Sequence, residues 1–297
     1  MSRYVILLVS LLLVVIVILA IYQSRTGTEP EATLPTTSPM APEAAMQHAE
    51  RGIALVEEYQ YDEAIVEFDK AVVLDPELAM AYVYRGSVYN VKGEFGKAIA
   101  DLNKAIELDP ELAMAYANRG NSNNGKGEFD KAIADLNKAI ELDGGLAMAY
   151  VSRGFAYLSK GDFDQAIADC SKAIELNPEL ATAYGNRGYA YYGKGDFNQA
   201  IADLSKAIEL DPEFAMAYNN RGIVYGMKEE YHKAIADFDK AIELDPDLAI
   251  AYYNRSYASK FLSWKTLAIA DLEKCIELSD DPELVESARQ LLDELRY

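Results

Sequence analysis

The chain has 297 residues, a net charge of −20 and only two cysteines. So acidic a chain repels the phosphates of nucleic acids and attracts basic partners, so we expect no DNA or RNA binding. The distant pair of Cys170 and Cys275 forms neither a disulfide framework nor a metal-binding spacing. We therefore expect no metal ion and no cofactor.

The N-terminus contains a long apolar segment. Residues 4–22 form a run of 19 residues without a charge, interrupted only by Ser10. A helix of this length spans about 28 Å, close to the hydrocarbon thickness of a bilayer. The run is longer than the apolar region of a cleaved signal peptide, and no A-x-A-like cleavage site follows it. We predict an uncleaved transmembrane signal anchor over residues 1–22, and a cleaved signal peptide is the alternative.

The flanks of this segment bear on orientation. Arg3 and the α-amino group precede the run, whereas Arg25 follows it and is soon joined by acidic residues. The positive-inside rule thus slightly favours a cytoplasmic N-terminus, with the rest of the chain outside the cytoplasm. Residues 23–42 are rich in threonine and proline and lack hydrophobic periodicity, which predicts a disordered linker.

Residues 43–282 contain a repeat of 34 residues. The seven units begin at residues 45, 79, 113, 147, 181, 215 and 249, most of them with the phrase Ala-Met-Ala-Tyr. Position 8 of the unit is glycine in all but the last, position 20 is always alanine, and position 27 is alanine or, at Cys275, cysteine. Small residues at these positions would let two helices approach closely.

These residues resemble the tetratricopeptide repeat (TPR) family over residues 45–282. The resemblance implies an all-α fold, in which seven helical hairpins stack into a right-handed superhelical solenoid with a concave groove. Residues 283–297 are expected to form a capping helix with an apolar face, and the N-terminal transmembrane helix completes the fold. Departures from the pattern at His48, Asn123 and Gly144 predict looser packing, not another fold.

Charged residues also recur in register. Position 7 is arginine and position 23 is acidic in all seven units. Pairing within each unit is the prediction, although the lysine three residues after each acid could compete for it. A ladder of arginines that binds carboxylates or phosphates is the alternative.

No catalytic pattern is present in the sequence. Residues 120–127 and 188–195 imitate a phosphate-binding loop, but they lack the Ser or Thr that holds Mg²⁺ and follow no strand. His48 and His232 lie in different units, and both cysteines occupy packing positions. We therefore expect no enzymatic activity.

The resemblance also implies a binding surface, because positions 2, 5, 6, 9, 12 and 13 of a TPR unit generally face the groove. In this chain those positions carry mainly amide, aromatic and thioether side chains. An asparagine amide both donates and accepts hydrogen bonds, which suits the backbone of an extended peptide. Asparagines that serve only helix packing or solubility are the alternative. The predicted groove residues are Asn118, Asn121, Asn186, Asn220, Asn254, Tyr189, Tyr192, Tyr253, Tyr257, Phe155, Met148 and Met216.

The predicted function is a membrane-tethered scaffold that binds an extended segment of a protein or peptide partner, with basic partners favoured by the charge. The alternative is a structural array at the membrane, in which nearly identical units self-assemble into oligomers.

Overall fold

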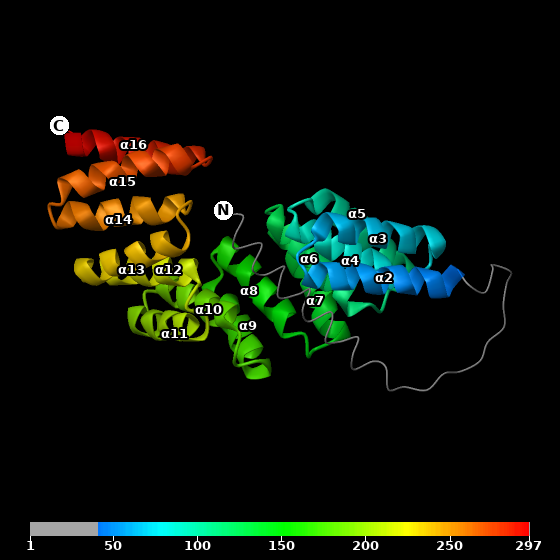
Figure 1. Cartoon of the computed structure of the whole chain (residues 1–297). Coiled ribbons are helices and arrows are strands. Elements are labelled where there is room, and N and C mark those ends of the chain that lie inside the picture. Colours follow the sequence, from blue (N-terminus) through cyan, green and yellow to red (C-terminus); the bar gives the residue numbers. More distant parts are fainter. Residues whose placement is uncertain (1–40, 297) are drawn as a thin grey trace. The chain divides into compact units, whose positions relative to one another are not determined.

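A computed structural model describes residues 41–296, which form α-helices joined by short turns (Figure 1). The chain divides after Lys160 into two compact bodies, called the first and second body below. The first body contains α2 (Ala41–Glu57), α3 (Tyr61–Leu74), α4 (Ala79–Val91), α5 (Phe95–Leu108), α6 (Ala113–Gly125), α7 (Phe129–Leu142) and α8 (Ala147–Lys160). The second contains α9 (Phe163–Leu176), α10 (Ala181–Gly193), α11 (Phe197–Leu210), α12 (Ala215–Met227), α13 (Tyr231–Leu244), α14 (Ala249–Phe261), α15 (Lys265–Leu278) and α16 (Pro282–Arg296).

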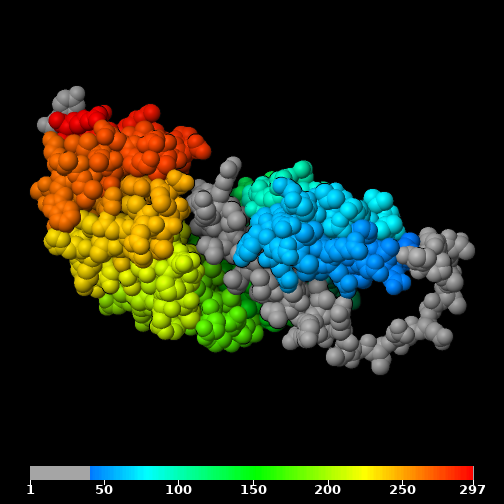
Figure 2. Space-filling view, in the orientation of Figure 1, coloured from blue at the N-terminus to red at the C-terminus, as the bar shows by residue number. Residues whose placement is uncertain are grey.

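Within each body, every helix packs mainly on its neighbours in sequence, as the colour order in Figure 2 also shows for the second body. The predicted units appear as hairpins of two helices, the first starting at position 1 in units two to seven. The fourth hairpin supplies α8 to the first body and α9 to the second.

A glycine ends the first helix of the central hairpins. Gly93 has a φ of +73°, a left-handed conformation that costs glycine little. The amide of Glu94 then donates to the carbonyl of Tyr89 at 2.8 Å, and that of Gly93 donates to Asn90 at 3.0 Å. This is the Schellman arrangement, which satisfies carbonyls that the helix end leaves free. In the first and the last two units the left-handed residue is not glycine but Tyr59, Glu229 or Ser263.

An extended residue ends the second helix of a hairpin. In α5 the amide of Asp109 still donates to the Ala105 carbonyl at 2.8 Å, but Asp109 itself is extended, as suits a residue before proline. Its carboxylate accepts from the amide of Glu111 at 3.0 Å and closes the turn. The third unit has the same extended residue, Asp143, although Gly144 replaces proline there.

The two helices of a hairpin pack closely through the small residues of the repeat. A Cβ atom on Gly120 would lie 2.7 Å from Cγ of Leu136, so no larger residue fits there without movement. Ala132, Leu136 and Ala139 on the second helix are fully buried. The repeated small residues are thus explained by helix contact.

The capping helix is confirmed. Ala288, Leu291 and Leu292 of α16 are buried against Leu272 and Cys275 of α15. Its opposite side is exposed and mostly polar. The last hairpin is therefore covered by a helix with one apolar and one polar face.

The start of α2 differs from expectation. Ala41 and Pro42, which we assigned to the linker, already belong to this helix, where proline is compatible with the first turn. No helix among residues 41–296 is long and apolar enough to cross a membrane. The predicted anchor and nearly all of the linker lie outside the described residues.

Candidate peptide-binding surface

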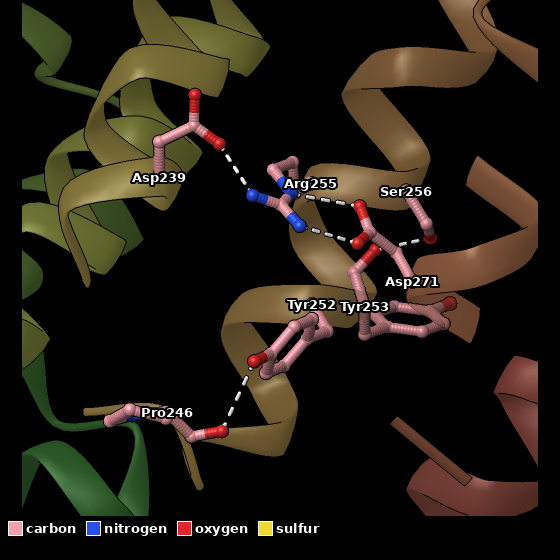
Figure 3. A network of polar contacts seen from close by, with 7 residues as sticks. All are labelled: Asp239, Pro246, Tyr252, Tyr253, Arg255, Ser256 and Asp271. Atoms are coloured by element: carbon pink, nitrogen blue, oxygen red, sulfur yellow. Dashed lines mark hydrogen bonds and ion pairs between the residues drawn. The ribbon is translucent and has the colours of Figure 1, made fainter. Parts of the chain in front are cut away.

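The arginines at position 7 hold the hairpins together. Arg255 donates from Nε and one terminal nitrogen to both carboxylate oxygens of Asp271, at 2.9 and 2.6 Å, and its third nitrogen donates to Asp239 at 2.5 Å (Figure 3). Tyr252, under the guanidinium at 5.7 Å, donates its hydroxyl to the carbonyl of Pro246. The same two-nitrogen contact with the acid of the unit joins Arg85 to Asp101, Arg119 to Asp135, Arg187 to Asp203 and Arg221 to Asp237.

In units two to seven the third nitrogen of the arginine donates to the residue at position 25 of the preceding unit. Arg187, for example, donates to the hydroxyl of Ser171 at 3.1 Å. The hydrogen bonds from Arg85 to Asp101 are the main reason why the pKa of Arg85 is raised above its ordinary value. These guanidinium groups therefore join helices and neighbouring units, which favours pairing over the alternative of an arginine ladder for ligands.

The first unit is an exception, and there the predicted pairing is wrong. Glu67 binds His48 at 2.6 Å and Lys70 at 2.5 Å, whereas Arg51 is exposed. Position 4 is histidine here and tyrosine in the other six units, and Nδ1 of His48 contacts Glu67. In most later units the lysine binds a glutamate three residues further on, as Lys206 binds Glu209. Pairing of Arg153 with Asp169 stays a prediction, because these residues belong to different bodies.

The second body presents exposed aromatic and methionine side chains along one set of helices, where Lys260 is the one charged residue at the same positions. Helices α10, α12 and α14 are neighbours, and because they are equivalent helices of the repeat, positions 9, 12 and 13 of their units fall on corresponding sides. The exposed fractions are 39% for Tyr189, 56% for Met227, 50% for Tyr257 and 51% for Phe261. With the half-buried Tyr192, these residues are called the aromatic strip below.

Contacts between rings fix the aromatic strip. Tyr189 and Tyr192 lie with their centroids 5.7 Å apart, and Tyr192 stacks on Phe197 at 6.3 Å. Tyr257 meets Phe261 edge to face at 5.3 Å. Large rings with few free rotations lose little conformational entropy when they bind, so this arrangement suits a docking surface.

The asparagines beside the strip bind one another. Asn254 Nδ2 donates to Asn219 Oδ1 of the preceding unit at 2.9 Å, and Asn219 Nδ2 donates to Asn220 Oδ1 at 3.3 Å. The hydrogen bonds of this chain of amides use Asn220 Oδ1 and Asn254 Nδ2, which leaves Asn220 Nδ2 and Asn254 Oδ1 outside it. Asn186 is half-buried. Part of the predicted ladder thus serves packing between units, as the alternative proposed.

Asparagines in the first body also join units. Asn90 Nδ2 donates to the carbonyl of Asn118 at 3.0 Å, and its Oδ1 accepts from the hydroxyl of Ser122 at 2.6 Å. One unit later, Asn124 Nδ2 donates to the carbonyl of Ser152 at 2.9 Å. Position 12 therefore links one first helix to the next.

Several buried polar atoms of α6 and α8 have no hydrogen-bond partner. They are Asn118 Nδ2, Asn121 Oδ1, Asn124 Oδ1 and the hydroxyl of Ser152. A buried polar group without a partner costs about 1–3 kcal/mol, so native proteins keep few of them. These atoms are therefore unused hydrogen-bonding capacity in α6 and α8.

The structure corrects part of the predicted groove. Asn118 and Met148 are exposed by only 1% and 2%, and Asn121 is also buried, so they do not form an open surface. Asn118 lies against the preceding unit through Asn90. Phe155 is half-buried against Phe129, and Met216 packs near Phe214. Tyr253 is half-buried beside the capping helix.

Other residues of this surface were missed from sequence. Met227 is the most exposed member of the aromatic strip, and Trp264 lies nearby in sequence with 43% exposure. The partners of the arginines at position 25 were missed as well, although that position is polar in all seven units. The sequence signal was therefore present for the second group.

The chemistry of the described residues offers no reactive centre. Burial raises the pKa of Cys170, and it raises the pKa of Cys275 to about 11, so both thiols are protonated at neutral pH. No three acidic, histidine or cysteine side chains among residues 41–296 are grouped to hold a metal ion. Burial also raises the pKa of Tyr192 and Tyr253, which stay neutral phenols.

Family profiles match most of the repeat region. A profile described as TPR repeat matches residues 86–125 and 188–229, and two described as tetratricopeptide repeat match residues 113–145, 147–180 and 215–248, and residues 249–282. Together these profiles cover more than half of the chain. No curated protein sequence matches it.

Solved structures share the fold. A tetratricopeptide repeat protein from Parabacteroides merdae has a TM-score of 0.66 at 19% identity, over 86% of this chain and 100% of that one. A chain of the APC/C hetero-tetramer Cut9–Hcn1 has a TM-score of 0.73 at 20% sequence identity, and the match covers 88% of this chain and 50% of that one. Yeast Tom70 has a TM-score of 0.57 at 21% sequence identity, and the match covers 86% of this chain and 54% of that one. At these identities the likeness shows the fold alone.

The hairpin repeat, the capping helix and the matching profiles lead to one conclusion: the chain belongs to the tetratricopeptide repeat family, as an all-α array of about seven hairpins of the kind that typically serves as a scaffold for protein–protein interaction.

Proposed function

We propose that the chain binds an extended segment of a partner protein along α10, α12 and α14. The observation that carries this proposal is the aromatic strip, whose outer side chains are 39–56% exposed. Exposed apolar side chains that gather on one face, rather than lying singly, mark interaction surfaces. Aromatic and methionine side chains are also the types enriched where proteins meet.

The spacing of the strip suits an extended chain. Packed helices lie about 8–10 Å apart, and an extended peptide advances about 3.3 Å per residue. About three peptide residues therefore correspond to one unit, and about nine to the three units of the strip. The free amide atoms of Asn220 and Asn254 lie on the same helices, where they could bind the peptide backbone.

The experiment that tests this function is a peptide-library binding screen. The full-length chain is kept in a non-ionic detergent because of its apolar N-terminus. Beside it are screened a strip variant, Tyr257→Ala with Phe261→Ala, and an amide variant, Asn220→Ala with Asn254→Ala. We expect selected peptides, loss of binding in the strip variant and weaker binding in the amide variant, with unchanged helicity. If no peptide is selected, or the strip variant binds equally well, the proposed function is wrong.

We further propose that residues 4–22 tether this scaffold to a membrane, with the repeats outside the cytoplasm. The support is the uncharged run of 19 residues and the position of Arg3 before it. Extraction tests the tether, because a membrane-spanning chain stays in the pellet at alkaline pH. Protease added to intact cells tests the orientation, and repeats that stay protected would contradict it.

A self-assembling array remains the second candidate, but the capping helix argues against growth at the C-terminal end. Helix α16 turns Leu291 and Leu292 inward and leaves charged residues such as Asp293 on its outer side. A further unit would have to stack on that polar face. Light scattering on the full-length chain, with detergent subtracted, distinguishes a monomer from an assembly.

A further inference from the structure

We propose that the aromatic strip selects segments that carry arginine or lysine side chains, which it holds by cation–π contacts. This inference rests on the proposed function and names the chemistry of its partner.

The chain already pairs cations with tyrosine rings throughout its repeats. The guanidinium carbon of Arg187 lies 5.6 Å from the centroid of Tyr184, and that of Arg221 lies 5.7 Å from that of Tyr218. Such a contact is attractive because the face of an aromatic ring carries partial negative charge. These tyrosines of position 4 are therefore occupied by the arginine of their own unit.

The rings of the aromatic strip have no such partner within the second body. Tyr189, Tyr257 and Phe261 are exposed, whereas the cation–ring contacts among residues 161–296 involve Tyr184, Tyr218, Tyr225 and Tyr252. Phe261 stacks on Tyr231, and it also meets Tyr257 edge to face. Phe261 and Tyr257 are nonetheless 51% and 50% exposed, so part of each ring is available to a cation from outside.

Charge around the strip favours a cation over an anion. The one cation at its groove positions, Lys260, is held by Glu294 of the capping helix at 2.7 Å. The chain as a whole carries a net charge of −20. The surrounding field therefore attracts a basic segment within about a Debye length, and no unpaired cation at these positions repels it.

An aliphatic partner would use the same surface differently. It would bury the same rings, but it would gain nothing from their charge distribution or from the net charge of the chain. Replacing the rings by leucine keeps most of the apolar area and removes the negative ring faces. The two kinds of partner can therefore be separated by the response to leucine.

The experiment measures binding of three labelled nine-residue peptides to the full-length chain by fluorescence anisotropy, at low and at physiological salt. The peptides alternate proline with arginine, with leucine or with glutamate. The test variant is Tyr257→Leu with Phe261→Leu. The matched control is Tyr59→Leu, an exposed tyrosine of the first body, 66% accessible and outside the strip. A second variant, Tyr257→Phe, keeps the ring.

We expect the arginine peptide to bind most tightly and the glutamate peptide not at all. The double leucine variant should weaken binding of the arginine peptide by about 5- to 30-fold, the loss of two exposed cation–π contacts. Tyr257→Phe and Tyr59→Leu should bind like the wild type. Thermal melting of each variant shows that the fold is kept.

Two results overturn the inference and leave the proposed function intact. One is a leucine peptide that binds as tightly as the arginine peptide. The other is arginine-peptide binding that the double leucine variant does not change, which would assign it to net charge alone. Absence of arginine-peptide binding also overturns the inference, and the library screen then decides separately whether the proposed function survives.

Discussion

The ring of Phe261 lies parallel to that of Tyr231, with 4.7 Å between their centroids and 2° between their planes. Phe261 ends α14 and Tyr231 begins α13, so the stack joins two neighbouring units of the second body. In units with Gly125 or Gly193 at the same position, the ring of the preceding unit occupies that space instead. Position 13 thus meets the ring at the start of the second helix of the preceding unit in these units, and at Phe261 this contact becomes a stack of two rings.

Two buried serines of the first body should respond oppositely to alanine, because one hydroxyl has a hydrogen-bond partner in the neighbouring unit and the other has none. Ser152→Ala removes a buried hydroxyl without a partner and should stabilise the protein by about 0.5–1 kcal/mol. Ser122→Ala breaks the bond to Asn90 and should destabilise it by about 1–2 kcal/mol. Both changes share the same gain in helix propensity, so the contrast isolates the hydrogen bond. Urea unfolding measures it, and two equal effects would contradict the account.

Gly144 occupies a position where most other units have proline. Asp143 before it is already extended, and the amide of Gly144 donates no backbone hydrogen bond. Gly144→Pro should therefore raise the free energy of unfolding by about 0.4–1 kcal/mol, because it restricts the unfolded chain. The control is Gly93→Pro, which has an incompatible φ of +73° and should destabilise the protein. A loss of stability in Gly144→Pro would show that the third turn differs from the others.

Glu229 adopts a left-handed conformation that glycine takes in the central units. Its φ is +60°, which is strained for a residue with a Cβ atom. Glu229→Gly should stabilise the protein by about 0.5–1 kcal/mol, whereas Glu229→Ala removes the charge but keeps the strain. Thermal melting compares the two variants. If alanine stabilises as much as glycine, the effect comes from the charge and not from the backbone.

The pair of Arg187 and Asp203 should show strong energetic coupling. Two hydrogen bonds of 2.7 and 2.9 Å join these mostly buried side chains. A double-mutant cycle with alanine should give a coupling of about 1–3 kcal/mol. The exposed pair of Lys206 and Glu209 serves as a matched control with much weaker coupling. Equal coupling in the two cycles would contradict a structural role for the ion pair and would favour the alternative, in which the arginines bind a ligand.

Much of this fold was predictable because the same pattern of residues recurs in all seven units. Glycine at position 8 and alanine at position 20 recur in register, and the structure uses both for helix contact. The apolar face of α16 was also predictable, since Leu291 and Leu292 follow helical spacing. The ion pair predicted for the first unit was wrong, because Glu67 binds His48 there. A substitution in one unit cannot be interpreted from the other six.

The candidate site was less predictable for a physical reason. Groove positions describe the average TPR unit, but exposure depends on how closely neighbouring helices lie. Asn118 is buried against the preceding unit, whereas Asn220, at the same position, is only half-buried. Side chains such as Asn90 decide this through contacts between units, and those contacts depend on residues one repeat away.

The most direct test of the central claim locates a bound peptide on the protein. A photoreactive benzoylphenylalanine replaces Tyr257 in one variant and Tyr59 in another, and a peptide selected by the library is added to each. Both sites are exposed tyrosines, so they differ mainly in their place on the protein. We predict crosslinking at residue 257 that excess unlabelled peptide abolishes, and none above background at residue 59. Crosslinking at residue 59 alone, or equally at both sites, would show that the peptide does not bind along the aromatic strip.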